Sequence, residues 1–263
     1  MSVLDGKVAL VTGANGGLGL AISRGLGRAG CKLVMSDVDD FGSAPELCRE
    51  IEQQENGEAL YVAANLVDVG ETLGLFEAAS CRFGGIDILV NNAVVRHFAP
   101  IEEFSVAWWN EALAVNVSAA FHLARLVLPQ MRARRYGRII NLSSVYGVRA
   151  TANRVDYVTT KAALLGLTRA VAVETAGQGI TCNAVLPGAV LSSSSEARIQ
   201  ALMQAQGWSR EKATQSFLAG KQPTGRFIPA ESVVELIVFL CGASAQDITG
   251  AVLPIDAGWL ANA

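Results

Sequence analysis

The chain has 263 residues, of which 51% are hydrophobic and 17% are charged, and its formal net charge is −3 at pH 7. A chain of this length and composition can bury a sizeable core within one α/β domain. The balance of charge leaves no broad basic surface, so we expect no nucleic acid partner.

The five cysteines are widely spaced and form no Cys-x-x-Cys pair. This spacing argues against a zinc site or a disulfide framework, so we expect no metal and reduced cysteines in a cytoplasmic protein. The N-terminus lacks the charged-then-apolar layout of a signal peptide. No apolar run reaches the length of a membrane span, so we expect no membrane association.

A short apolar run at 8–11 leads directly into a glycine-rich turn at 12–19, and apolar residues then recur at helical spacing as far as Gly30. This order predicts a buried parallel strand, a tight turn and a helix. Glycines let the backbone approach a pyrophosphate closely, and the helix N-terminus offers free N–H groups. The stretch predicts a nucleotide site, with a purely structural turn as the alternative.

The second predicted strand, at 32–36, ends at Asp37. An acidic residue about 20 positions past the glycines accepts hydrogen bonds from the adenosine ribose, and it repels a 2′-phosphate. Because no arginine or lysine lies beside Asp37 or within the glycine turn, the sequence favours NAD over NADP.

The rest of the chain alternates between helical and strand patterns. We expect helices at 44–56, 71–82, 105–131 and 157–176, and strands at 59–63, 86–90, 138–141, 181–185 and 251–255. This alternation predicts a doubly wound parallel sheet formed as one domain over residues 1–263.

The segment between Pro187 and Glu231 breaks this alternation. It shows two short helical patterns, at about 196–206 and 209–219. A long insertion after the carboxyl end of a strand is typical of a substrate lid, here about 190–225. A flexible surface excursion is the alternative.

In the predicted helix at 157–176, Tyr157 and Lys161 are one turn apart and share a face. A free tyrosine has a pKa of about 10 and is a poor base at neutral pH, but a neighbouring ammonium group favours the phenolate. A hydroxyl such as that of Ser144 can hold a substrate oxygen beside it. Taken alone, the pair also fits the surface of an amphipathic helix.

In combination, these motifs resemble the short-chain dehydrogenase/reductase family. The shared elements, in family order and spacing, are Thr12-Gly13-x-x-x-Gly17-x-Gly19, Asn91-Asn92-Ala93, Asn116, Ser144, Tyr157-x-x-x-Lys161 and Pro187-Gly188. The resemblance implies a Rossmann-type domain that binds NAD(H) or NADP(H). It also implies a homotetramer packed through the helices at about 105–130 and 157–176.

The resemblance assigns roles to individual residues. Tyr157 exchanges a proton with the substrate oxygen, while Lys161 assists it and holds the nicotinamide ribose. Ser144 orients the substrate, and Asn116 supports a water relay. The implied cofactor contacts are Gly13, Asn15, Gly16, Gly17, Leu18, Gly19, Asp37, Asn65, Leu66, Asn92, Ala93, Tyr157, Lys161, Pro187, Gly188, Val190 and Ser192.

Four positions depart from the family pattern. Val94 and Ala257 stand where glycine is usual, and Asn65 stands where an aspartate contacts the adenine. An amide still offers a donor and an acceptor at that position. Ser192 replaces a threonine and keeps the hydroxyl.

Among family members, the chain resembles the bacterial 3-hydroxybutyrate dehydrogenases in segments such as His97-x-Ala99-Pro100-Ile101-Glu102 and Gly258-Trp259-Leu260. The positions that hold the substrate carboxylate in those enzymes differ. Here they are Arg96, Tyr146, Arg154 and Arg198, and Ala189 replaces a tryptophan over the substrate. The placement of Arg154 and Arg198 resembles that of 2-hydroxypropyl-coenzyme M dehydrogenases.

Guanidinium groups suit carboxylates, sulfonates and phosphates. We therefore expect NAD-dependent oxidation of a secondary alcohol on a small anionic substrate, with sulfonates and sugar acids ahead of hydroxybutyrate. The alternative for the arginines themselves is that they are solvated surface residues. A sugar or polyol dehydrogenase with a neutral substrate, whose arginines bond hydroxyls, is one alternative function. A non-catalytic dinucleotide-binding sensor or scaffold is another.

Overall fold

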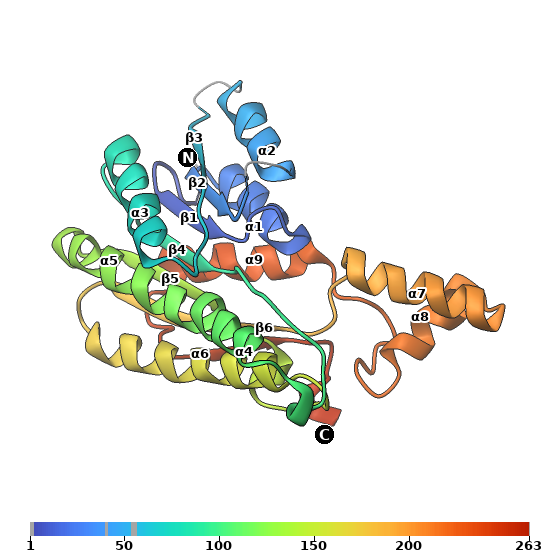
Figure 1. Cartoon of the computed structure of the whole chain (residues 1–263). Coiled ribbons are helices and arrows are strands. Elements are labelled where there is room, and N and C mark those ends of the chain that lie inside the picture. Colours follow the sequence, from blue (N-terminus) through green and yellow to red (C-terminus); the bar gives the residue numbers. More distant parts are fainter. Residues whose placement is uncertain (1–2, 40–41, 54–56, 263) are drawn as a thin grey trace.

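A parallel sheet with strand order β3-β2-β1-β4-β5-β6-β7 forms the centre of the computed structural model (Figure 1). The structure describes residues 3–39, 42–53 and 57–262. The strands are β1 Val8–Thr12, β2 Lys32–Asp37, β3 Ala59–Ala63, β4 Ile88–Asn91, β5 Gly137–Leu142, β6 Ile180–Pro187 and β7 Val252–Ile255. The predicted doubly wound parallel sheet is confirmed.

Both faces of this sheet are covered by helices, which explains why its strands read as continuous apolar runs. Alternate residues serve opposite faces: Ala9 and Val11 join one core cluster, whereas Val8 and Leu10 join the other. The first cluster includes residues of α1 Gly17–Arg28, α2 Ser43–Glu52 and α9 Ala230–Cys241. The second includes residues of α3 Val69–Phe83, α5 Ala119–Arg134 and α6 Val155–Glu174.

The strand order reverses beside β1. Leu10 of this strand pairs with Val34 of β2 on one side and with Leu89 of β4 on the other. The chain therefore leaves β1 and β4 in opposite directions, and a crevice opens between their carboxyl ends.

The helices differ from the expected ones in three places. Helix α2 ends at Glu52, and the residues 54–56 of the expected helix lie outside the described part of the chain. The long helix expected at 105–131 is divided into α4 Val106–Leu113 and α5 by a π-helical turn, Ala114–Ser118. Helix α9, which packs on α1, was not predicted.

The continuous helical stretch Val106–Arg134 is unusually apolar. It is long enough to cross a membrane and has a mean hydropathy of 1.4 in its most apolar window, of which 39% is buried. The expectation that no segment reaches this length and composition was wrong. The stretch packs on α3, β5 and α6, so one of its sides belongs to the protein core.

Two helices form the expected lid segment, α7 Ser193–Gln206 and α8 Arg210–Leu218, and they project away from the sheet (Figure 1). Arg210 joins them by two hydrogen bonds to the carboxylate of Glu196, at 2.5 and 2.6 Å. The two ends of the segment also meet: Val190 forms a parallel bridge with Ile228, and Ile228 N–H donates to Ala189 O at 3.0 Å.

Candidate active site

The turns after β1 and β4 are fastened to each other. Asn92 Nδ2 donates to the carbonyl oxygens of Thr12 and Gly13, both at 3.0 Å. Thr12 Oγ1 accepts from the N–H groups of Asn92 and Ala93, both at 3.1 Å. Gly13 has a φ of +66°, and a Cβ there would lie 2.8 Å from Ala93 Cα. Only glycine fits this position.

A cavity of about 720 Å³ opens at the carboxyl edge of the sheet. This volume is in the usual range of ligand sites. Each residue that the sequence predicts to contact the cofactor lines it. Several lining residues were not predicted: Val38, Ala64, Val67, Val94, Val95, Glu111, Val115, Leu142, Ser143 and Leu191.

The residues at one end of this cavity fit a dinucleotide. Helix α1 begins after Gly16, which provides no side-chain cap, so its first N–H groups are available to a phosphate. The Asp37 carboxylate accepts from Asn15 N–H at 2.8 Å and from Val38 N–H at 2.9 Å. These bonds hold a negative charge beside the glycine turn, where it suits ribose hydroxyls and opposes a 2′-phosphate.

Tyr157 and Lys161 lie on the first turns of α6 and both line the cavity. Lys161 is 3% exposed, and its Nζ donates to Leu142 O at 2.6 Å. The same Nζ lies 5.6 Å from the centroid of the Tyr157 ring. Burial lowers the pKa of Lys161 to about 7, and the nearby positive charge of Arg96 acts in the same direction. The expected tyrosine and lysine pair is therefore brought together.

Ser144 follows β5 and is buried. Its Oγ accepts from Tyr146 N–H at 3.2 Å, which caps a short 3₁₀ turn and leaves the hydroxyl hydrogen to be donated elsewhere. The Tyr146 ring is edge-on to the Tyr157 ring, with centroids 6.3 Å apart. Neither Ser144 nor Tyr146 is among the residues that line the main cavity, although both lie close to Tyr157.

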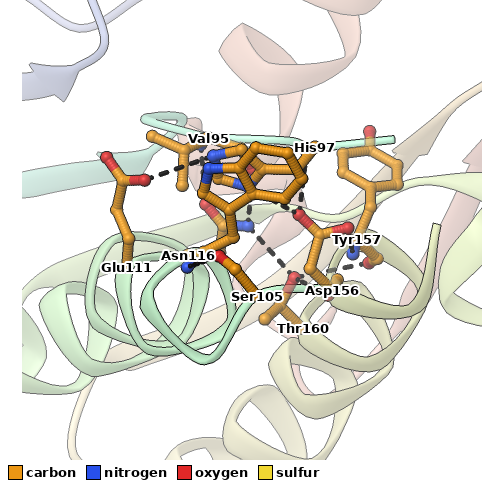
Figure 2. A network of polar contacts seen from close by, with 9 residues as sticks. Val95, His97, Ser105, Glu111, Asn116, Asp156, Tyr157 and Thr160 are labelled. Atoms are coloured by element: carbon orange, nitrogen blue, oxygen red, sulfur yellow. Dashed lines mark hydrogen bonds and ion pairs between the residues drawn. The ribbon is translucent and has the colours of Figure 1, made fainter. Parts of the chain in front are cut away.

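Asn116 lies in the π-helical turn and is 2% exposed. Its Oδ1 accepts from Val95 N–H, and its Nδ2 donates to Val95 O, both at 2.9 Å. Nδ2 also reaches Thr160 Oγ1 at 3.1 Å, next to Lys161 (Figure 2). The amide thus fastens the segment after β4 to α6. π-Helical turns often mark functional sites.

A second set of polar residues lies beside Tyr157, and sequence reasoning missed it. Figure 2 shows His97 between Glu111 and Asp156. Nε2 of His97 lies 3.2 Å from Glu111, and Nδ1 lies 3.2 Å from Asp156, whose side chain is fully buried. Asp156 also accepts from His97 N–H at 2.9 Å and from Tyr157 N–H at 2.6 Å. The ring stacks on Trp108 at 4.9 Å.

The three predicted substrate arginines have different surroundings. Arg96 is exposed and lines the main cavity. Arg198 is exposed on α7 and lies outside the lining of that cavity. Arg154 is half-buried and lines a separate cavity of about 420 Å³. Arg154 lies over the Tyr157 ring, and the three arginines lie on different surfaces, so the structure does not gather all three at one point.

Arg154 is held by aromatic rings. Its guanidinium carbon lies 4.4 Å from the ring centroids of both Phe98 and Tyr157. Its buried Nε and Nη2 have no hydrogen-bond partner within the described residues. Burial lowers the pKa of Arg154 below its ordinary value.

Known proteins are similar to this chain over nearly its whole length. Residues 7–202 match the family model described as short chain dehydrogenase. D-beta-hydroxybutyrate dehydrogenase from Cupriavidus necator is 38% identical over 99% of this chain and 100% of its own length. The enzyme of the same name from Rhizobium meliloti is 37% identical over 97% and 99% of the two chains.

A solved structure is also similar throughout its length. L-sorbose reductase from Gluconobacter frateurii, complexed with NADPH and L-sorbose, has a TM-score of 0.92 and 31% sequence identity, and 99% of each chain is covered.

Proposed function

The chain belongs to the short-chain dehydrogenase family, and from this premise we propose that it transfers a hydride between NAD and the secondary alcohol or ketone of a small anionic substrate. The family and the hydroxybutyrate dehydrogenase relatives make it an oxidoreductase that acts on hydroxyl or keto compounds. The cofactor, the charge of the substrate and the residue roles below are our proposal.

In the proposed mechanism, Ser144 donates its free hydroxyl hydrogen to the substrate oxygen, and Tyr157 accepts the hydroxyl proton during oxidation. Lys161 holds the nicotinamide ribose, and Asn116 fixes the loop beside it. Bound NAD supplies the hydride acceptor.

NAD is proposed ahead of NADP because of Asp37. Its carboxylate is fixed by two backbone N–H groups beside the glycine turn. A 2′-phosphate there would meet a negative charge without a compensating cation in the turn, whose residues 13–19 include no arginine or lysine. The sorbose reductase, in contrast, was solved with NADPH.

The observation that carries the proposed anionic substrate is the position of Arg154. Two nitrogen donors of the Arg154 guanidinium are buried and have no hydrogen-bond partner within the described residues. The same guanidinium lies next to the Tyr157 ring. Leaving such donors unpaired is costly, and a carboxylate or sulfonate satisfies both together. The hydroxybutyrate dehydrogenase relatives are named for a substrate of this charge.

Steady-state kinetics tests this function with 3-hydroxybutyrate and the neutral 1,3-butanediol, each with NAD and with NADP. We expect NAD and the anion to give the higher kcat/KM. Arg154→Gln should lower kcat/KM for the anion by about tenfold or more, as for loss of a charged hydrogen bond, and leave the neutral alcohol little changed. Equal losses on both alcohols would contradict the anionic substrate.

The neutral sugar or polyol remains a second candidate. It is favoured by the similarity to L-sorbose reductase over 99% of both chains. In this case Arg154 bonds hydroxyls, and the neutral member of the substrate pair should react faster. The non-catalytic alternative is disfavoured, because Asn116, Ser144, Tyr157 and Lys161 are all present and the close relatives are dehydrogenases.

We also propose that the chain acts as one domain in a cytoplasmic homotetramer without membrane association. The apolar helical stretch supports this assembly: Val106 is 73% exposed, Phe121 is 48% exposed, and Val173 on the adjoining α6 is 78% exposed. Packing of α4, α5 and α6 against a second copy would cover these side chains.

A further inference from the structure

Two cations of the lid share one aromatic ring. Lys221 follows α8, and its Nζ lies 4.0 Å from the centroid of Phe217 and donates to Phe217 O at 2.8 Å. The guanidinium carbon of Arg198, on α7, lies 5.7 Å from the same centroid. The pair of charges is therefore fixed by one ring at the base of the helical hairpin.

This pair also lies close to the main cavity, because Gln222, the residue after Lys221, accepts a hydrogen bond from Ala189 N–H, between the lining residues Gly188 and Val190. Burial lowers the pKa of Lys221, and the positive charges of Arg198 and Arg154 lower it further. In the described part of the chain, none of these three cations forms an ion pair with a carboxylate. The lid carboxylate of Glu196 is already bound by Arg210. Like charges gathered without a counter-charge repel one another, and a bound anion relieves that cost.

A single anionic group cannot pair with Arg154, Lys221 and Arg198 together. The unpaired atoms of Arg154, Nε and Nη2, form one edge of the guanidinium, and this edge binds both oxygens of a single carboxylate. Arg198 on α7 and Lys221 after α8 lie on another segment of the chain and beside another ring. They are therefore available to a second negative group of the same molecule.

We propose that Lys221 and Arg198 form a second anion position on the lid, so that the preferred substrate is a secondary alcohol carrying two separate anionic groups. The chemistry fits a hydroxy dicarboxylate. This inference rests on the proposed dehydrogenase function and deepens it: Arg154 distinguishes an anion from a neutral alcohol, and Lys221 distinguishes a dianion from a monoanion.

The test compares alcohols that differ in charge: 1,3-butanediol, 3-hydroxybutyrate and 3-hydroxyglutarate, with glycerol 1-phosphate as a dianion whose charges lie on one group. We expect kcat/KM to be about tenfold higher for 3-hydroxyglutarate than for 3-hydroxybutyrate, as for one added charged hydrogen bond. Lys221→Gln should remove this advantage, mainly through KM, and Lys221→Arg should retain it. Glycerol 1-phosphate should not show the advantage, because it has no second group for the lid.

Lys212→Gln is the matched control, because this exposed lysine of α8 also lies over an aromatic ring, Trp208, at 4.8 Å. It should leave every kcat/KM unchanged. The inference is overturned if the wild-type protein does not prefer 3-hydroxyglutarate to 3-hydroxybutyrate, or if Lys221→Gln lowers kcat/KM equally for these two substrates. If the neutral alcohol is the best substrate, the proposed function itself fails.

Discussion

At the scale of single residues, Ala257 shows how a local departure leaves strain behind. It has a φ of 54°, in the left-handed region that residues other than glycine rarely adopt. The turn around it is fixed by Asp256, which accepts from Gly258 N–H at 3.0 Å and from Leu260 N–H at 2.7 Å. The backbone therefore has no easy way to relax.

Replacing Ala257 by glycine should stabilise the protein. Relief of the left-handed conformation contributes about 1–2 kcal/mol, and the greater freedom of glycine in the unfolded chain offsets about half of it. We expect the free energy of unfolding to rise by about 0.5–1 kcal/mol in a urea titration. Ala78→Gly, in the interior of α3, is the matched control and should lose about 1 kcal/mol. A loss at both positions would contradict the strain.

The buried Lys161 makes stability depend on pH. Its pKa is about 7 in the folded protein and 10.5 in its ordinary state, so the unfolded chain binds more protons between these values. The free energy of unfolding should therefore rise with pH from about 7 to about 10. Below about pH 7, the full cost of burying a charged Lys161 lowers the stability. Each unit of pKa corresponds to about 1.4 kcal/mol, so the change amounts to a few kcal/mol.

Urea titrations of the cofactor-free protein at several pH values measure this effect. Lys161→Met should flatten the rise, and Lys212→Met, at an exposed position, should not. The same slope in wild-type protein and Lys161→Met would show that another group is responsible.

At the scale of the elements, the start of α6 is positioned by a network rather than by its own sequence. Asp156 accepts backbone N–H groups from His97 and Tyr157 and faces the imidazole of His97 (Figure 2). Loss of its carboxylate would leave those donors unpaired in a fully buried place.

Asp156→Ala should lower the free energy of unfolding by about 2–4 kcal/mol, as expected for several unpaired buried donors. Because the Tyr157 backbone is one of the groups released, kcat should fall more than NADH affinity. Unfolding curves, kinetics and NADH fluorescence titration measure the three quantities. Glu111→Gln keeps a hydrogen-bond acceptor for His97 and should change each of them less. Unchanged kcat in Asp156→Ala would exclude a positioning role.

Local sequence patterns predicted the motifs of the site but not the residues that position them. The glycine turn, Asp37 and the tyrosine-lysine pair were predicted because each depends on neighbours in sequence or on a fixed family spacing. The residues that position them were not: His97 and Asp156 are 59 positions apart. The π-helical turn depends on bonds from Asn116 to Val95 and Thr160, which lie on other segments. No periodicity records such contacts.

At the scale of the whole molecule, the doubly wound parallel sheet was predicted, because parallel strands joined by helices have few permitted topologies, but its strand order was not. The two helices of the lid segment were predicted, but the surroundings of the Arg198 side chain were not. The sequence of a short polar helix specifies weakly which of its faces is exposed. The assembly was expected from the family resemblance alone and stays a prediction.

Disruption of the apolar face tests that assembly. Phe121→Glu places a charge on a side chain that is 48% exposed in the single chain. If α5 packs against a second copy, the charge is desolvated there and the tetramer should dissociate, as light scattering after size exclusion would show. Val3→Glu is the control at a residue 72% exposed and remote from that helix in sequence. A wild-type monomer would contradict the assembly.

The closed base of the lid has an evolutionary consequence. Since Val190 and Ile228 are bridged, the intervening 191–227 begins and ends at one point of the body. Mutations can therefore lengthen or shorten such a segment, or change its charge, without disturbing the sheet that holds the glycine turn. Changes in the outer part of the segment, α7 and α8, can therefore accumulate without altering the residues that line the cofactor cavity.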